Sequence, residues 1–415
     1  MSQKQVKLTA SSIPSPVLSH AFSFLDWTVI LVSINLVCWA WNKTQNIRDV
    51  LKKVQKRDLE RVLSKFAPHG VKEIYVVGRC CWACVLKRLC CQLERCSQLR
   101  HLALELESSN DGQTLKLNKE LWTVTNRLES LELINDCSRN TFDLEPADQL
   151  RRLKLVNFDL RLCPEGFFSS FKLDDLVLES VHLDSDQVQE IARNHLIKSL
   201  GFVWCSRTVV TEFLARLRHP YRALRVQCYW FQVKEKLNCS LMTDYLINQA
   251  EKLEELCFTL PVSTFLLAGL LRQWATLKVL ELGDVPMEAF PLFPALVNLE
   301  LLRLEYYDSR LDFTGNGFSS PGSDSSCTFR SLAESVHVVS YLRANKKLRD
   351  LKLCQVPDLR GEDLEKLCPQ LPCLEKLESS PFPLEIKERL LVSCPNIRIR
   401  FVQGNRPFAS KLNKE

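Results

Sequence analysis

The stretch LKVLELGDVPMEAFPLFPALVNLELLRLE, residues 277–305, decides the fold because it contains one pattern twice. A Leu-x-x-Leu-x-Leu motif begins at Leu277 and begins again 22 residues later at Leu299. A motif this short predicts a short strand whose alternate leucines point to the same side. No single unit can bury these leucines alone, so neighbouring units are expected to stack on one another.

The motif continues in both directions along the chain, with a modal interval of 22–24 residues. Its first apolar position is occupied in turn by Val71, Leu99, Leu128, Leu150, Leu173, Ile197, Tyr221, Leu253, Leu277, Leu299, Leu348 and Leu374. This spacing is typical of leucine-rich repeats, which have roughly 20–29 residues. The ninth position, where such repeats often carry Asn or Cys, is irregular, since it holds Phe158, Val181, Cys205, Val285, Tyr307 and Val356.

Between the motifs, apolar residues at helical spacing predict helices. The expected ranges are 185–195, 208–218, 241–251, 264–274, 332–343, 362–368 and 384–392. We therefore expect an α/β fold over residues 71–402, a curved solenoid with short parallel strands on its concave face and helices on its convex face. Residues 403–415 form a basic tail.

Two segments depart from this regular pattern. The interval from Leu299 to Leu348 is 49 residues, and residues 308–327 within it are rich in Ser, Gly and Asp. They predict an inserted loop, which is either a tolerated insertion or a docking loop for a substrate. Residues 46–70 predict a linker helix, because residues 47–66 keep apolar side chains at helical spacing. Its basic face is either solvated, on the convex helix of a first repeat, or in contact with an acidic partner or nucleic acid.

The fifth position of each motif is expected to face the concave surface. Its occupants are Tyr75, Ala103, Glu132, Lys154, Val177, Gly201, Arg225, Cys257, Glu281, Arg303, Lys352 and Glu378. No stripe of one sign runs along this set, which argues against electrostatic binding of nucleic acid and favours a protein ligand. The substrate-binding candidates are Tyr75, Glu132, Lys154, Arg225, Glu281, Arg303, Tyr306 and Lys352. Aromatic residues suited to anchoring a ligand are Trp204, Tyr229, Trp230, Phe231, Tyr306 and Tyr307.

Residues 11–42, SSIPSPVLSHAFSFLDWTVILVSINLVCWAWN, are unlike the rest of the chain. The uncharged run at 27–42 is shorter than the roughly 20 apolar residues of a membrane span. Pro14 and Pro16 can open a helix, and the apolar spacing that follows predicts three short helices. A unit this small cannot bury all of its apolar faces, so one face is expected to bind a partner.

The same stretch carries an ordered set of short motifs. They are Ile13-Pro14, Val17-Leu18, Phe24-Leu25-Asp26, Val29-Ile30-Leu31 and Leu36-Val37-Cys38-Trp39-Ala40-Trp41. In this order they resemble an F-box, placed at residues 11–45, and the whole chain resembles F-box proteins with leucine-rich repeats. Two details depart from the family pattern: Pro16 stands where an acidic residue is usual, and the basic residue common between Cys38 and Trp41 is missing.

This resemblance implies a function and partners. Members of the family are substrate-recognition subunits of Skp–cullin–F-box ubiquitin ligases, so the F-box would bind the Skp adaptor, and through it cullin, while the repeats would hold a protein substrate. The implied adaptor-binding residues are Ile13, Pro14, Val17, Leu18, Phe22, Leu25, Ile30, Leu31, Leu36, Val37 and Trp41. Some of them would instead form the core of the three helices.

The composition narrows the other possibilities. The chain has eighteen cysteines, and many of them stand at positions that alternate with leucine. Residues 1–10 lack a signal-peptide pattern, which argues against a secreted disulfide framework. We therefore expect reduced thiols in a cytoplasmic or nuclear protein. A C-x-x-C pair at Cys81 and Cys84 leaves open structural cysteines, zinc or a redox pair. No catalytic motif appears, so we expect neither an enzyme nor a cofactor. The alternatives are a leucine-rich-repeat scaffold or inhibitor outside ubiquitination and, more distantly, a zinc- or thiol-dependent enzyme.

Overall fold

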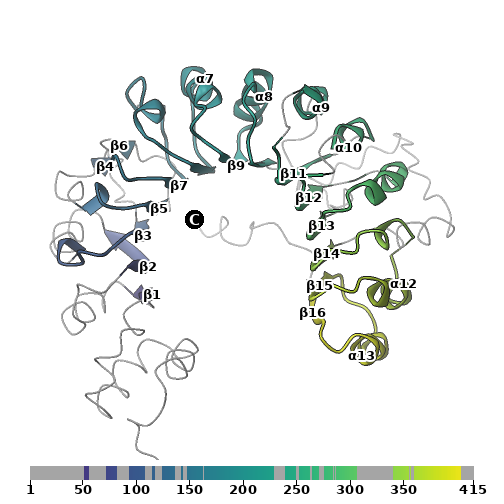
Figure 1. The fold of residues 1–415 in the computed structure, drawn as a ribbon. Helices are drawn as coiled ribbons and strands as arrows, with labels where there is room; N and C mark the ends of the chain where they lie inside the picture. The colour runs from purple at the N-terminus through teal and green to yellow at the C-terminus, as the bar shows by residue number, and fades with distance from the viewer. Residues whose placement is uncertain are drawn as a thin grey trace, which may run out of the picture. The chain divides into compact units, whose positions relative to one another are not determined.

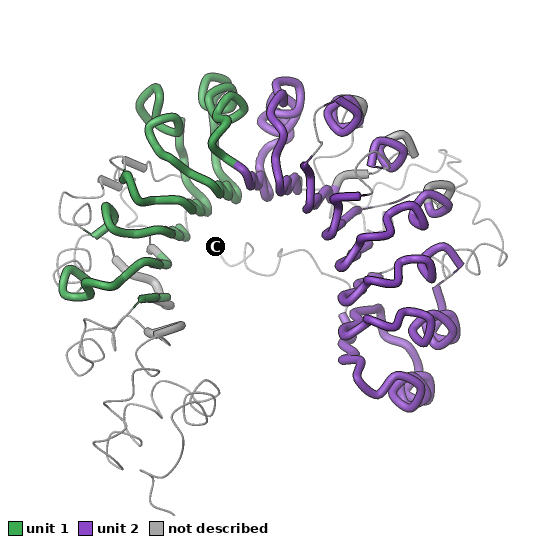
Figure 2. The backbone as a smooth tube through the Cα atoms, viewed as in Figure 1, with its two compact units in different colours: residues 1–197 green, residues 198–415 purple. Residues whose placement is uncertain are grey.

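The structure is a computed structural model. It describes residues 51–55, 72–81, 93–107, 115–116, 124–135, 142–143, 147–161, 163–228, 239–248, 252–261, 264–270, 275–283, 285, 287–305, 340–354, 356 and 359–402. The chain divides into two compact units, unit 1 at residues 1–197 and unit 2 at residues 198–415, which are coloured separately in Figure 2. The F-box expected at 11–45, the inserted loop at 308–327 and the tail at 403–415 lie outside the described residues.

Unit 1 is built on a parallel sheet. In order across that sheet its strands are β1 (Leu51–Gln55), β2 (Glu73–Cys81), β3 (His101–Glu107), β5 (Ser130–Asn135), β7 (Arg152–Val156) and β8 (Asp175–Glu179). The two-residue strands β4 (Leu115–Lys116) and β6 (Phe142–Asp143) form a separate parallel pair. Its described helices are η6 (Phe168–Ser170) and α7 (Ser185–Arg193).

Unit 2 is likewise built on a parallel sheet, whose strands follow in sequence order. They are β9 (Ser199–Cys205), β10 (Ala223–Cys228), β11 (Glu255–Pro261), β12 (Val279–Gly283), β13 (Leu301–Glu305), β14 (Asp350–Cys354), β15 (Lys376–Ser379) and β16 (Arg398–Phe401). The helices are α8 (Arg207–Arg216), α9 (Cys239–Asn248), α10 (Thr264–Leu270), η9 (Met287–Ala295), α12 (Gly361–Leu367), η10 (Cys368–Gln370) and α13 (Leu384–Ser393). Within this unit the strands form one layer and the helices the other (Figure 1).

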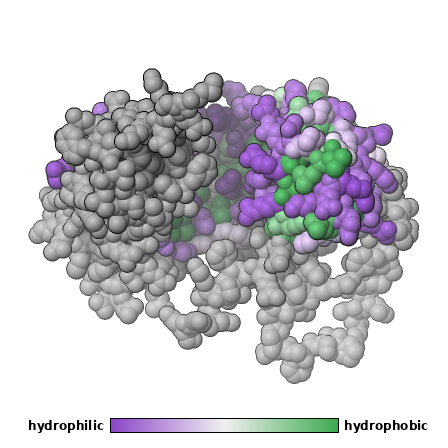
Figure 3. All heavy atoms as spheres, turned by 90° about the horizontal axis from the view of Figure 1, so that it is seen from below, coloured by the Kyte–Doolittle hydropathy of each residue, from purple (hydrophilic) through white to green (hydrophobic). Residues whose placement is uncertain are grey.

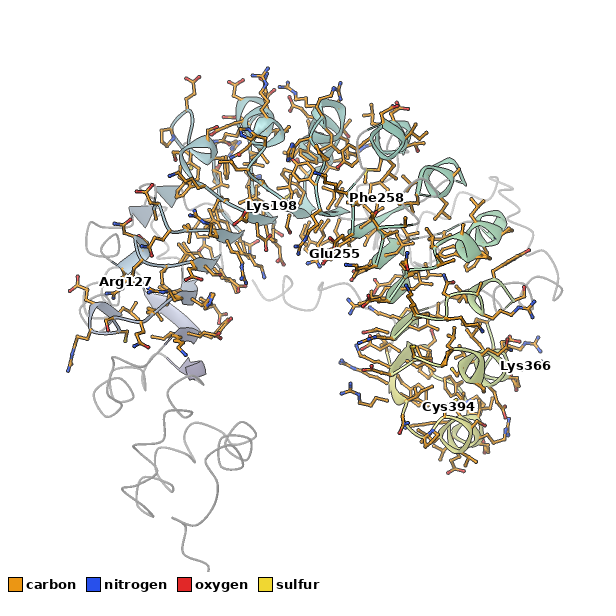
Figure 4. All side chains as sticks on the ribbon, in the orientation of Figure 1. Arg127, Lys198, Glu255, Phe258, Lys366 and Cys394 are labelled. Carbon is orange, nitrogen blue, oxygen red and sulfur yellow. The ribbon has the colours of Figure 1, made fainter. Side chains whose placement is uncertain are left out.

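The core lies between these two layers and is made by the leucine motif. Every described residue at the first position of the motif is at most 5% exposed. Within β12 the second and third leucine positions, Leu280 and Leu282, are also buried, while Glu281 between them is not. In Figure 4, Glu255 lies on the strand side of unit 2 and Lys366 on the helical side. The predicted leucine-rich-repeat solenoid is therefore confirmed as the fold.

Hydrogen bonds at the strand entries connect each repeat to the next. The carbonyl of Glu254 accepts from the amides of Lys278 and Val279, at 2.8 and 3.0 Å. The carbonyl of Lys278 accepts in the same way from Glu300 and Leu301. The pattern recurs in unit 1, and in each case one carbonyl at the second motif position satisfies two amides of the following repeat. We call these bonds the entry ladder.

The prediction of a linker helix at 46–70 is wrong for residues 51–55, because these residues form strand β1. These residues pair in parallel with β2, with Leu51 opposite Ile74 and Val54 opposite Val76. An irregularity between Leu51 and Val54 inserts an extra residue, so positions three apart in β1 are opposite positions two apart in β2. A bulge of this kind gives a strand the three-residue spacing that otherwise predicts a helix.

In the sheet, no further strand lies between the strands on either side of the long interval from Leu299 to Leu348. β13 pairs directly with β14, with Leu302 opposite Leu351 and Leu304 opposite Leu353. The strands of the motifs at Leu299 and Leu348 are therefore neighbours in the sheet.

Candidate functional site: the strand face

The residues at the fifth motif position lie in register on the face of each sheet opposite the leucine core. In unit 2 the strand pairing aligns Gly201, Arg225, Cys257, Glu281, Arg303, Lys352, Glu378 and Arg400. In unit 1 it aligns Tyr75, Ala103, Glu132, Lys154 and Val177. We call each set the position-5 column of its unit.

Within unit 2, charged side chains on this face pair from strand to strand. Arg303 Nη1 lies 2.9 Å from Glu281 Oε1, and Arg303 Nη2 lies 3.8 Å from Asp350 Oδ2. Asp350 also meets Lys376 at 3.3 Å, and Lys376 meets Glu378 at 2.8 Å. These contacts form one continuous network across β12–β15, in which Asp350 lies between the cations Arg303 and Lys376.

Two further ion pairs lie on the same face. Lys352 Nζ donates to the Glu305 carboxylate on the neighbouring strand β13. At the other end, Arg400 Nη1 reaches Glu378 Oε1 at 3.8 Å. The predicted alternation of sign along the column is therefore accompanied by mutual neutralisation, which leaves little net field along the face.

Cys257 joins the polar network to β10. Its thiol accepts from Gln227 Nε2 at 2.9 Å and donates to Glu281 Oε2 at 3.2 Å. Burial, followed by the charge and hydrogen bond of Glu281, raises the pKa of the Cys257 thiol well above its usual range. The sulfur therefore stays protonated as a hydrogen-bonding group and is not a nucleophilic thiolate.

Arg225 differs from the other charged residues of the unit 2 column. It is exposed and forms no ion pair with a carboxylate of the described residues, because Gly201 and the thiol of Cys257 flank it in the column. Near it, Trp204 is half-buried at a positive φ of 54°, on an irregularity of the β9–β10 pairing. A bulky residue rarely adopts this conformation, which marks the end of β9 as locally strained.

In unit 1 the face carries a smaller set of charges. Lys154 Nζ lies 2.8 Å from Glu132 and 3.7 Å from Glu179, so one cation connects β5, β7 and β8. All three side chains are about one-third exposed, so solvent weakens these pairs.

The structure thus places seven of the eight substrate-binding candidates on a strand face. Tyr75, Glu132 and Lys154 lie on unit 1, and Arg225, Glu281, Arg303 and Lys352 lie on unit 2. Tyr306 lies outside the described residues, as do all of the predicted adaptor-binding residues.

Sequence reasoning missed several polar residues on the unit 2 face. Asp350 and Lys376, at the third motif position, and Glu305, at the seventh, form ion pairs with the column. The period of two in an extended strand places these positions on the same face as the fifth, so the signal was present. Arg400 was missed because Ile397 precedes Ile399 by only two residues, which shortens the last motif.

No group of histidine, cysteine or acidic side chains suited to a metal ion is found within the described ranges. Over the same ranges, no helix has the length and apolar character needed to cross a bilayer.

No protein-family model matches the chain, and no curated protein matches it. Among solved structures, an internalin from Listeria monocytogenes strain 4b F2365 is 13% identical, with a TM-score of 0.33, over 85% of this chain and 95% of the internalin. TLR13, in a complex with ssRNA13, is 14% identical with a TM-score of 0.38, over 76% of this chain and 46% of TLR13. Both are leucine-rich-repeat proteins, and at these identities the likeness does not reach beyond the fold.

Proposed function

We propose that the chain is the substrate-recognition subunit of a Skp–cullin–F-box ubiquitin ligase. The observation that carries the proposal is the order of modules: an F-box-like stretch at residues 11–42 precedes a leucine-rich-repeat array. In this proposal the F-box binds the Skp adaptor and the strand faces bind a protein substrate. The chain itself catalyses nothing and acts by raising the local concentration of substrate lysines near the ubiquitin-charged enzyme.

The chemistry of the strand face supports a protein as the ligand. Charges that neutralise one another, as Glu281 and Arg303 do, present no extended basic surface to a phosphate backbone. A half-exposed face of mixed polar groups instead offers the varied contacts that protein interfaces use. Arg225, as an exposed cation without an ion pair to a described carboxylate, is the first residue to test for substrate contact.

The proposal extends to the cellular compartment. Five described cysteines form no disulfide, namely Cys257, Cys354, Cys368, Cys373 and Cys394. Free thiols in this number suit a reducing environment, so we place the chain in the cytoplasm or nucleus.

Co-expression of the full chain with the Skp adaptor tests the adaptor contact. We expect the two to purify as a stoichiometric complex, and we expect Val17→Ala, Leu18→Ala and Leu25→Ala together to abolish it. Arg225→Ala is the matched control, since it lies on the strand face and should leave the complex intact. Retention of the adaptor by the triple variant, or failure of the wild-type chain to bind it, would count decisively against the proposal.

A second candidate is a protein-binding scaffold or inhibitor outside ubiquitination. It is favoured by the self-contained strand-face network of unit 2, which needs nothing from residues 1–42. In that case the N-terminal residues would serve only as a cap, and deleting residues 1–42 should unfold or aggregate the array. Under the ligase proposal the same deletion leaves a soluble array that still unfolds cooperatively on heating.

A further inference from the structure

Among the described residues, the last strand of unit 2 has an open edge. β16 pairs with β15, and no described strand lies on its other side. The amides of Arg398 and Val402 donate to the carbonyls of Glu375 and Ser379, each at 2.9 Å. Because alternate amides of a parallel strand bond to the same neighbour, those of Ile399 and Phe401 face the open edge.

The terminal helix α13 is likewise covered by no described element on the side away from α12. Its Ile386 and Leu390 are buried, and its Arg389 makes two hydrogen bonds to Glu365 of α12, at 2.9 and 3.0 Å. Leu384 is 63% exposed and Leu391 38% exposed. Two surfaces of the helix are therefore occupied, and a third carries uncovered leucines.

This third surface borders the open edge of β16. Helical spacing places Leu384, Lys387 and Leu391 on one side of α13. Lys387 Nζ lies 5.2 Å from the centre of the Phe401 ring, and Phe401 also contacts Phe382 edge-to-face at 4.9 Å. We call the open edge together with Leu384, Lys387, Leu391 and Phe401 the end face.

In the preceding repeat, the corresponding side of helix α12 is covered by the next helix, α13. At Gly361 of α12, an added Cβ would lie 2.7 Å from Ile386 Cδ1, so α13 closes tightly against α12. No described element closes against α13 in the same way. Figure 3, which views the molecule from below Figure 1, shows hydrophobic residues surrounded by hydrophilic ones at this end of unit 2. An exposed apolar patch with a polar rim is typical of a protein-binding surface.

Charge indicates what kind of segment fits. Three cations, Lys387, Arg398 and Arg400, lie at the end face, and the side chain of Arg400 is 76% exposed. Against them stands one exposed carboxylate on that side of α13, Glu388. A second copy of the chain would bring the same cations against them. The chain's own residues 403–415 carry three basic residues and one acidic residue, so they repel the end face as well. An acidic segment is the complementary occupant.

We propose that the end face binds an extended segment of a partner protein in which acidic and apolar residues alternate. The segment adds to the sheet as a strand beside β16 and satisfies the free amides of Ile399 and Phe401. Its carboxylates pair with Arg398 and Arg400 on one face of the sheet. Its apolar side chains, on the other face, contact Phe401, Leu384 and Leu391. This surface is separate from the proposed adaptor contact. It adjoins the proposed substrate face, because Arg400 also belongs to the position-5 column of unit 2.

Fluorescence anisotropy with two labelled peptides tests the proposal on the full chain. One peptide contains three Glu-Val pairs between Gly-Ser ends, and the other contains three Lys-Val pairs in the same frame. We expect the acidic peptide to bind and the basic peptide not to bind. In the variant Arg398→Glu with Arg400→Glu, the acidic peptide should weaken by about tenfold or more and the basic peptide should begin to bind. Equal binding of the two peptides, or no binding of the acidic one, would overturn the proposal.

A matched pair of substitutions on α13 tests the apolar contact. Leu391→Asp should abolish binding of the acidic peptide, whereas Val392→Asp should not change it, although Val392 is 84% exposed. An equal loss of peptide binding in both variants would show non-specific binding and overturn the proposal. Acidic-peptide binding that appears only after deletion of residues 403–415 would assign the edge to that tail and also overturn it. Thermal unfolding confirms that each variant remains folded.

Discussion

An interior repeat and the last repeat of unit 2 use the same motif but present different surfaces. On β14, Asp350 and Lys352 both find partners on adjacent strands. On β16, Arg400 has one partner on one side, and none of the strand's side chains is fully buried. The difference comes from the neighbour and not from the motif, since each repeat is completed by the one that follows it. A surface that is closed in the interior is therefore available for binding at the end.

The largest expected difference between the two repeats is in the core. Leu351 of β14 and Ile399 of β16 occupy equivalent positions, but Leu351 is 0% exposed and Ile399 is half-buried. We expect Leu351→Ala to lower the free energy of unfolding by about 2–5 kcal/mol because it leaves a cavity. Ile399→Ala should cost about 1 kcal/mol, since solvent or local relaxation fills the space. Urea denaturation followed by circular dichroism measures both, and equal losses would contradict the comparison.

The next effect concerns the closed contact between α12 and α13. Gly361→Ala should lower the free energy of unfolding by about 1–3 kcal/mol, because the new methyl group meets Ile386 and the Cβ of Phe382. Ile386→Val removes the nearest atom, so the cost of Gly361→Ala should be smaller in that background. A double-mutant cycle of denaturation midpoints checks this, and additive effects would show that the contact is not strained.

The ion pairs should show the same contrast at smaller scale. Arg303 is 31% exposed and Glu281 16%, so Arg303→Ala should cost about 1 kcal/mol after allowance for solvent screening. Arg400→Ala should change the free energy of unfolding by less than about 0.5 kcal/mol, because its side chain is 76% exposed. Raising the salt concentration should reduce the Arg303 effect, and an equal loss for the two arginines would contradict the comparison.

The smallest effect is a dependence on pH through Glu378. Burial raises the pKa of the Glu378 carboxyl, but the hydrogen bond and charge of Lys376, with the charges of Lys352 and Arg400, hold that pKa below its usual value. Because the folded-state pKa is lowered, the stabilisation is present above the unfolded pKa of about 4.3 and is lost as the pH falls through the folded-state value.

Denaturation at a series of pH values between 6 and 3 measures this contribution. We expect Glu378→Gln to reduce the loss of stability on the acid side, and Lys376→Met to do the same because it removes the main stabilising cation. An unchanged acid profile in both variants would show that the Glu378 contact contributes nothing.

The fold was predictable from the sequence because its signal is local and repeated. Even Tyr221, in place of leucine, is buried as its position in the motif requires. Strand β1 was not predictable, because its irregular pairing with β2 gives Leu51 and Val54 a helical spacing. The strand-face network was predictable only in part. The fifth motif position identifies Glu281 and Arg303, but the ion pairs that they form depend on distances between strands.

The entry ladder has a consequence for how the chain is made. Each carbonyl of the ladder belongs to the earlier repeat and accepts hydrogen bonds from two amides of the later one. The carbonyl of Glu254, for example, accepts from Lys278 and Val279. A ribosome releases the acceptor before the donors, since it synthesises the N-terminal side first. When a repeat emerges, the carbonyls that accept its entry-ladder hydrogen bonds are therefore already present on the preceding repeat. The array is suited to growing one repeat at a time during translation, with each new loop closed over a short stretch of chain.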